Sequence, residues 1–311
     1  MYKILSIDGG GIYGAFFASQ LMKLETLHPG FLDEIDLVAG TSIGGIIALA
    51  VADEMEMDKI IEIFSKEAGG IFHNSYLRKI LRIIGLKAKY NNKNLKKVLE
   101  EKFKDRALYD LKKKVVIPSF QIKADGQWQE KVFHNFDRIG GCPYPNIQKA
   151  SMGESIVDVA MATSAAPTFF PAYDVYIDGA VAQNNPAMQA LAFTQDDNFW
   201  GDTSPKLEEI KIFSIGCNYS GDEIQRSSMD WGYLRWIKYI FKILIRGNMV
   251  SSDYQCRQLL GHENYFRYCA NLPLELSKEL DSTELIQDLI EFDDCKQLAR
   301  ANEWIAKNWF D

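Results

Sequence analysis

Residues 35–45 read Ile35-Asp36-Leu37-Val38-Ala39-Gly40-Thr41-Ser42-Ile43-Gly44-Gly45, and an apolar run follows over 46–52. The apolar residues before the first glycine predict a buried strand, and those after the last glycine predict a helix, so the segment between them is a strand-to-helix turn. The start of the chain has the same order, because an apolar run over 2–7 precedes Asp8-Gly9-Gly10-Gly11 and a helical spacing of apolar residues over 13–27. Two such units in succession predict a parallel sheet covered by helices.

The rest of the chain continues this alternation. Strands are predicted over 115–120, 129–133, 175–177 and 210–215, and helices over 156–163 and 187–193. Residues 55–114 read as charged helices, and the part from Trp231 onward reads mostly as helices. We therefore expect an α/β fold of three layers, α/β/α, around a mostly parallel central sheet. Because no linker divides the chain, we expect one domain over 1–311, with a catalytic core at about 1–217 and a helical C-terminal part at about 218–311.

The composition excludes several classes of protein. With 47% hydrophobic and 25% charged residues, the chain of 311 residues is neither disordered nor a coiled coil. A net charge of −7 argues against a DNA or RNA partner. The five cysteines form no C-x-x-C pair, so we expect free thiols, no metal and no cofactor. No apolar stretch suits a signal peptide or a membrane-spanning helix, and we expect a cytoplasmic protein with at most a peripheral contact at the inner face of the membrane.

Ser42 lies in the pattern Gly-x-Ser-x-Gly, between the predicted strand and the predicted helix. A sharp turn at such a place exposes the serine hydroxyl, and small neighbours let the backbone pack closely around it. The first amides of the following helix favour a developing oxyanion. Ser42 is therefore a candidate nucleophile, although a glycine-rich turn with an incidental serine has the same pattern.

The second motif, Gly9-Gly10-Gly11, also follows a predicted strand and can turn successive backbone N–H groups toward an anion. That anion is either a phosphate or the oxyanion of an acyl-transfer step. A P-loop is excluded, because the Gly-Lys-Ser/Thr ending is absent. The spacing up to Gly14 matches the dinucleotide fingerprint G-x-G-x-x-G, but the second strand ends in Gly40-Thr41-Ser42 and lacks the acidic residue of that fingerprint.

Asp178 follows a short predicted strand and begins Asp178-Gly179-Ala180, which by itself is a common turn sequence. Among four histidines only His262 follows both Ser42 and Asp178, as the order of a Ser–Asp–His triad requires. The residues leave three interpretations open. They are a triad with His262, a Ser42–Asp178 dyad in which the carboxylate deprotonates the serine directly, and a module that binds a nucleotide without catalysis.

Taken together, the motifs resemble those of the patatin-like phospholipases. The resemblance covers about residues 1–217 and rests on four blocks in order, Asp8-Gly9-Gly10-Gly11-Ile12-Tyr13-Gly14, Gly40-Thr41-Ser42-Ile43-Gly44-Gly45, Ala162-Thr163-Ser164-Ala165-Ala166-Pro167 and Asp178-Gly179-Ala180. It implies a lipid acyl hydrolase without metal or catalytic histidine, in which Ser42 is the nucleophile, Asp178 the base, and Gly9, Gly10 and Gly11 the oxyanion hole. Tyr13 departs from the pattern, because that family often has Arg or Lys at this position.

The C-terminal part resembles a bacterial branch of the family, through Trp231-Gly232-Tyr233 and the run 254–261. Some members of that branch are antiphage effectors that cyclic dinucleotides switch on. The resemblance implies membrane phospholipid as the substrate and a cyclic dinucleotide as an activator.

Two segments bear on contact with a membrane. Within the aromatic-rich segment 231–250, cations recur at helical spacing and apolar residues lie on another face, the cations being Arg235, Lys238, Lys242 and Arg246. This pattern is typical of a helix in a lipid interface, and equally of a core helix with a solvated face. The basic span 78–97 allows the same two interpretations, a lipid-binding surface or an ordinary charged surface.

Overall fold

The computed structural model describes residues 1–71, 87–122, 127–139, 147, 149, 151–218, 230–277 and 279–310. Its centre is a sheet with the strand order β4-β3-β2-β1-β6-β7, in which β5 also pairs with β3. The strands are β1 Tyr2–Ile7, β2 Leu37–Gly40, β3 Lys114–Gln121, β4 Gln129–His134, β5 Tyr176–Asp178, β6 Ile210–Asn218 and β7 Tyr265–Asn271. All pairings are parallel except those of β4 and β5 with β3. The expectation of a mostly parallel sheet is confirmed.

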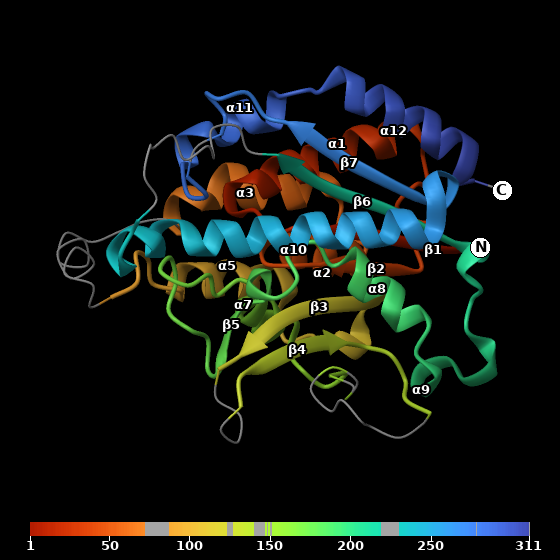
Figure 1. Ribbon diagram of the computed structural model, residues 1–311, viewed down its shortest axis with the longest axis horizontal. Helices are drawn as coiled ribbons and strands as arrows, with labels where there is room; N and C mark the ends of the chain where they lie inside the picture. The colour runs from red at the N-terminus through yellow and green to blue at the C-terminus, as the bar shows by residue number, and fades with distance from the viewer. Residues whose placement is uncertain are drawn as a thin grey trace.

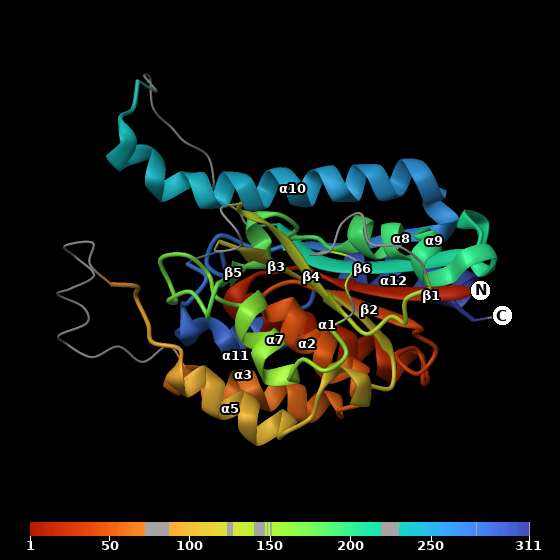
Figure 2. The ribbon, with the colours of Figure 1, turned by 90° about the horizontal axis from the view of Figure 1, so that it is seen from below.

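Helices cover both faces of the sheet and give the three expected layers (Figures 1 and 2). One face carries α1 Gly14–Leu27, α2 Ile43–Ala52, α3 Met57–Ile71, α5 Lys93–Phe103, α7 Ile156–Thr163, α11 Ile286–Glu291 and α12 Cys295–Asn308. The other face carries α8 Ala187–Thr194, α9 Asp197–Trp200 and the long α10 Tyr233–Asn264. Among the residues described above, no helix is both long and apolar enough to cross a membrane.

The side chains of β1 show why the sheet is buried on both faces. Leu5 and Ile7 belong to the larger core, under α1, α2 and α3, whereas Ile4 belongs to the smaller core, under α8 and α10. Because successive side chains of a strand alternate between faces, a central strand needs apolar residues at consecutive positions. This accounts for the continuous apolar runs from which we predict the strands.

The C-terminal part differs from the sequence prediction in one element, strand β7. It pairs in parallel with β6 and forms the edge of the sheet. The charge of Arg267 interrupts the apolar pattern of this strand, and α10, which is kinked at Gly261, leads directly into it without a separate loop. The charged span 55–114 holds α3 and α5, and its residues 72–86 lie outside the described residues.

Candidate active site

Ser42 occupies a strained turn between β2 and α2. Its backbone has φ 56° and ψ −124°, in the left-handed region that a residue with a side chain rarely adopts. Helix α2 crosses β1 closely at Gly44, where a Cβ atom would lie 2.3 Å from the carbonyl oxygen of Asp8. The turn that carries Ser42 therefore depends on the missing side chain at position 44, because only glycine lets α2 start this close to the end of β1.

Gly44→Ala should lower the free energy of unfolding by about 2 kcal/mol, because the added methyl group overlaps the backbone of β1. Gly153→Ala is the matched control, since a Cβ atom at Gly153 would have nothing within 4 Å. Denaturant unfolding of both variants measures the difference. Equal stability of the two variants would contradict this close approach.

Asp178 reaches Ser42 through the pairing of β3. One edge of β3 pairs with β2 at residues 114–116 and then with β5 at residues 119–121, while β4 occupies the other edge. Strand β5 thus continues the edge beyond the point where β2 ends, and its last residue, Asp178, lies beside the turn that follows β2. The hydroxyl of Ser42 donates to Oδ2 of Asp178 at 2.6 Å. The two residues, 136 positions apart, are brought together as the resemblance implies.

The environment of Asp178 alters its acidity. The carboxyl group is buried and contacts the Ser42 hydroxyl and the backbone N–H of Ala180, which donates to Oδ1 at 2.8 Å. Burial raises the pKa of Asp178 to about 7, against the opposing effect of these two hydrogen bonds. A carboxylate with such a pKa can exchange a proton with a neighbouring hydroxyl near neutral pH.

The segment that ends α7 supports both residues. Thr163 accepts a hydrogen bond from the backbone N–H of Ser42 at 3.0 Å and donates to the carbonyl oxygen of Pro118 in β3 at 2.6 Å. The carbonyl oxygen of Ala165 accepts from the N–H of Asp178 at 3.1 Å. The sequence block 162–167 therefore fixes the backbones of the serine and the aspartate relative to β3.

The glycine loop between β1 and α1 differs in part from the oxyanion hole that the resemblance implies. The N–H of Gly9 already donates to the carbonyl oxygen of Asn184 at 3.0 Å, and Nδ2 of Asn184 donates to the carbonyl oxygen of Gly9 at 3.2 Å. Within the described residues, the amides of Gly10 and Gly11 donate to no other group. Both glycines line the cavity beside Ser42, and Gly11 has φ 56°. Gly10 and Gly11 are thus the candidate oxyanion donors, and Gly9 anchors the loop.

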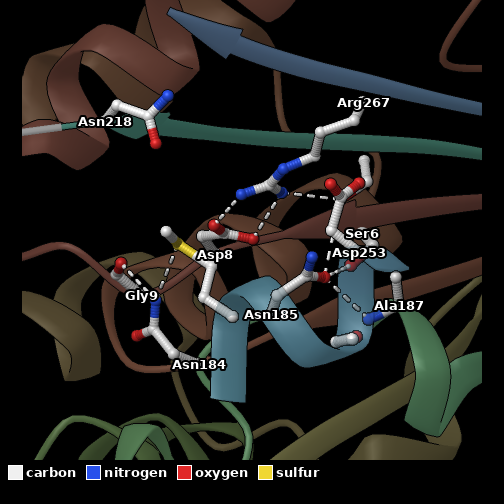
Figure 3. A network of polar contacts seen from close by, with 12 residues as sticks. Ser6, Asp8, Gly9, Asn184, Asn185, Ala187, Asn218, Asp253 and Arg267 are labelled. Atoms are coloured by element: carbon white, nitrogen blue, oxygen red, sulfur yellow. Dashed lines mark hydrogen bonds and ion pairs between the residues drawn. The ribbon is translucent and has the colours of Figure 1, made fainter. Parts of the chain in front are cut away.

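A buried ion pair holds the start of this loop. Figure 3 shows Asp8 against Arg267 of β7, where Nη1 of Arg267 donates to Oδ1 of Asp8 at 2.7 Å and Nη2 donates to Oδ2. Nη1 also donates to the hydroxyl of Ser214 in β6 at 2.7 Å. Both charged side chains are almost completely buried. Because Asp8 directly precedes Gly9, the pair fixes where the glycine loop leaves the sheet.

Helix α10 contacts both halves of the site through Asn248. Its Oδ1 accepts from the backbone N–H of Asn184 at 2.8 Å, and its Nδ2 donates to the carbonyl oxygen of Ala180 at 2.9 Å. Asn184 holds Gly9, and the N–H of Ala180 holds Asp178. One side chain therefore links the segment of the candidate base to the glycine loop.

A cavity of about 470 Å³ opens beside Ser42 and Asp178. Its walls are mostly apolar and come from both faces of the sheet, including Ile46, Phe64, Leu95, Phe170, Phe241 and Leu280. A cavity of this character suits an acyl chain better than the charged phosphates of a nucleotide.

The structure does not place His262 beside Ser42 and Asp178. His262 is exposed near the end of α10, beyond the kink at Gly261. At 1.5 Å per residue it lies on the order of 20 Å along the helix from Asn248, which contacts the site. His134 is packed against aromatic rings of the smaller core, His28 lies near Phe310, and His73 is outside the described residues. In the part of the chain that the structure describes, no histidine contacts Asp178.

Comparison with known proteins shows which family this chain belongs to. The sequence model of the family of patatin-like phospholipases matches residues 5–191, which is more than half of the chain. The chain belongs to this family. As a patatin-like phospholipase it is an enzyme that hydrolyses carboxylic esters.

Three relatives show how far the similarity extends. A cGAMP-activated phospholipase of Pseudomonas aeruginosa is 29% identical over 293 residues, which cover 92% of this chain and 83% of that protein. A protein of the same description from Vibrio cholerae is 27% identical over 310 residues, covering 89% of this chain and 84% of that protein. Patatin-like protein 2 of Oryza sativa subsp. indica is 29% identical over 279 residues, covering 76% of this chain and 66% of that protein.

Several residues at this patatin-like site are not evident from the sequence. Arg267, Asn184 and Asn248 lie outside the recognised motifs, and each acts through contacts between elements that are distant in the chain. A charged residue within a short aromatic run is the one signal that could have pointed to Arg267. Tyr13, where patatin-like proteins often carry a cation, is buried in the larger core.

Proposed function

We propose that this phospholipase cleaves fatty acyl esters of membrane phospholipids through an acyl-enzyme on Ser42, with Asp178 as the base. The observation that carries the proposal is the 2.6 Å hydrogen bond between Ser42 and a buried Asp178 whose pKa is about 7. Both Ser42 and Asp178 lie at the wall of an apolar cavity. Such a pair needs no histidine to activate the hydroxyl.

The first half of the reaction forms the acyl-enzyme. As the Ser42 oxygen bonds to the ester carbonyl carbon, its proton passes to Oδ2 of Asp178. The negative charge moves to the carbonyl oxygen, where the amides of Gly10 and Gly11 and the N-terminus of α2 stabilise it. The tetrahedral intermediate then expels the lysophospholipid alkoxide, which takes the proton from Asp178.

The second half releases the fatty acid. A water molecule gives a proton to Asp178 and bonds to the acyl carbon of the acyl-enzyme. The new tetrahedral intermediate breaks its bond to the Ser42 oxygen, which recovers the proton from Asp178. The carboxylate is therefore regenerated after each turnover, and the reaction consumes one ester and one water.

We also propose that a cyclic dinucleotide activates the enzyme, as part of antiphage defence. The support is the description of two relatives as cGAMP-activated phospholipases, each matching more than four fifths of this chain. We propose further that the catalytic residues and the C-terminal part form one domain, because β7 belongs to the same sheet as β1.

Hydrolysis of phospholipid vesicles tests these proposals together. Wild type, Ser42→Ala and His262→Ala are assayed with and without a panel of cyclic dinucleotides that includes cyclic GMP-AMP. We expect fatty acid release by wild type and His262→Ala, stimulation by at least one nucleotide, and no release by Ser42→Ala. Loss of activity in folded His262→Ala would refute the dyad, and equal rates across the panel would refute activation. A module that binds nucleotide without catalysis would release no fatty acid under any condition.

Asn248→Ala should lower kcat by about tenfold, with a smaller effect on KM, because both halves of the site lose one shared support. Asn248 touches the backbones of Asn184 and Ala180 and is a positioning residue. Kinetics on a soluble short-chain ester provide the measurement, and Gln195→Ala, on the surface, is the control. A change confined to stability, with kcat intact, would show that the link is only structural.

A further inference from the structure

Helix α10 is apolar on two opposite sides. Its inner side places Phe241 and Ile245 at the cavity and buries Met249. On its outer side five large apolar side chains are between 46% and 64% exposed, namely Ile240, Ile243, Leu244, Val250 and Tyr254. At about 100° per residue, these five fall in one arc opposite the inner side. Figure 2 shows α10 along the outer edge of the molecule, with one side of the helix not covered by the other ribbons.

An apolar stripe of this kind needs a partner. A helix that is apolar all round is normally buried, and exposed apolar residues along several turns mark an interaction surface. Isolated exposed residues need no such explanation, but here the five side chains recur at helical spacing over about four turns. We call these five residues the outer stripe of α10.

The charge around the outer stripe favours a lipid surface over a second copy of the chain. Residues 231–254, which include the whole outer stripe, contain four Lys or Arg and one acidic residue, Asp253, although the whole chain has a net charge of −7. Basic residues beside an apolar helix face attract anionic lipid headgroups. A two-fold contact between parallel copies of α10 through this face would instead bring the same positive segments together.

We propose that the outer stripe of α10 docks on the surface of a lipid bilayer, with the helix lying in the interface. This inference rests on the proposed function, which supplies lipid as the substrate. Phe241, Lys242 and Ile245, from the same turns of α10, line the cavity. Docking therefore brings the wall of the cavity to the membrane, and Asn248 on the inner side connects the docked helix to the site.

Flotation with phosphatidylcholine–phosphatidylglycerol vesicles tests the docking. All proteins are the full chain with Ser42→Ala, so that the lipids stay intact. The parent carries only this substitution, and the double variant adds Ile240→Gln and Leu244→Gln. Leu259→Gln is the matched control, because Leu259 is 50% exposed on the same helix but lies outside the arc of the outer stripe. The double variant should bind vesicles about tenfold more weakly, and the control should bind like the parent.

A second readout separates docking from chemistry. With Ser42 present, the double variant should hydrolyse a soluble short-chain ester like wild type, and hydrolyse vesicle lipid more slowly. Equal vesicle binding by parent and double variant would overturn the docking. An oligomer that the double variant dissociates, with vesicle binding unchanged, would instead assign the outer stripe to contact between copies. If wild type cleaves neither the soluble ester nor vesicle lipid, with or without the cyclic dinucleotides, the proposed function fails, while flotation still decides the docking.

Discussion

Asp178→Asn should lower the turnover number for phospholipid hydrolysis by about 10³-fold or more, because an amide cannot accept the proton of Ser42. Ser42→Ala should lower it by at least about 10⁴-fold, since the oxyanion donors and the cavity would then act without a nucleophile. Initial rates of fatty acid release from vesicles measure both effects. Residual activity of Asp178→Asn within about tenfold of wild type would contradict a role as base.

The pH dependence of the wild type follows from the same carboxyl group. Asp178 accepts a proton only when ionised, and its pKa is about 7. The kcat/KM for a soluble ester should therefore rise with pH, be half-maximal near pH 7 and reach a plateau above about pH 8. A profile already flat from about pH 5 upward would mean that the base has an ordinary carboxyl pKa.

Stability should change in the opposite direction to activity. The pKa of Asp178 is higher in the folded chain than the ordinary value of 3.8, so the folded state binds this proton more tightly than the unfolded state. The associated stability is present below about pH 4 and is lost as the pH rises through 7. Asn carries no charge to desolvate, so Asp178→Asn should be more stable than wild type by on the order of 4 kcal/mol at about pH 8, and by less than half of that at about pH 5. Thermal unfolding at both pH values measures this difference.

Arg267→Met should lower the free energy of unfolding by about 3–5 kcal/mol. The substitution keeps most of the side-chain volume but leaves the carboxylate of Asp8 buried without its partner. Because Asp8 precedes the glycine loop, any folded fraction should also lose turnover. Urea unfolding and soluble-ester kinetics measure the two effects separately.

The combined variant Asp8→Asn, Arg267→Met is the control for this prediction. Removing both charges leaves no uncompensated charge in the core, so the combined variant should recover much of the stability that Arg267→Met loses. Asp8→Asn alone completes the comparison. If the loss of stability in the combined variant equals the sum of the losses in the two single variants, a direct energetic coupling between Asp8 and Arg267 is contradicted.

The local pattern of the chain predicts much of the fold. Apolar runs and helical spacing predict strands β1, β3, β4 and β6 and helix α7, because the apolar pattern that marks each element lies within that element's own residues. Strand β7 does not follow from such a pattern. Its Arg267 can be buried because Asp8, 259 residues earlier, and Ser214 accept its hydrogen bonds. A charge that a distant partner compensates looks, in sequence, like a surface residue.

In the site, too, the features set by local sequence are predictable and those set by distant contacts are not. Ser42, Asp178 and the glycine loop are predictable, because each needs a special turn directly after a strand. The engagement of the Gly9 amide by Asn184, and the link through Asn248, depend on how the loop after β5 and helix α10 pack against β1. No periodicity in the sequence reports on that packing. The segments 72–86 and 219–229, and the side chains of Arg235 and Lys238, lie outside the described residues, so part of the basic span 78–97 and part of the cation stripe remain predictions.

The central claim is that Asp178 makes the oxygen of Ser42 nucleophilic, and the rate of its phosphonylation measures this directly. A fluorophosphonate probe is added to the whole protein, and the labelled residue is identified by mass spectrometry of peptides. We expect label on Ser42, at a rate that increases with pH around 7 and falls by about 10²-fold or more in Asp178→Asn. Label on another residue, or labelling of Ser42 at the same rate with Asn at position 178, would contradict the claim.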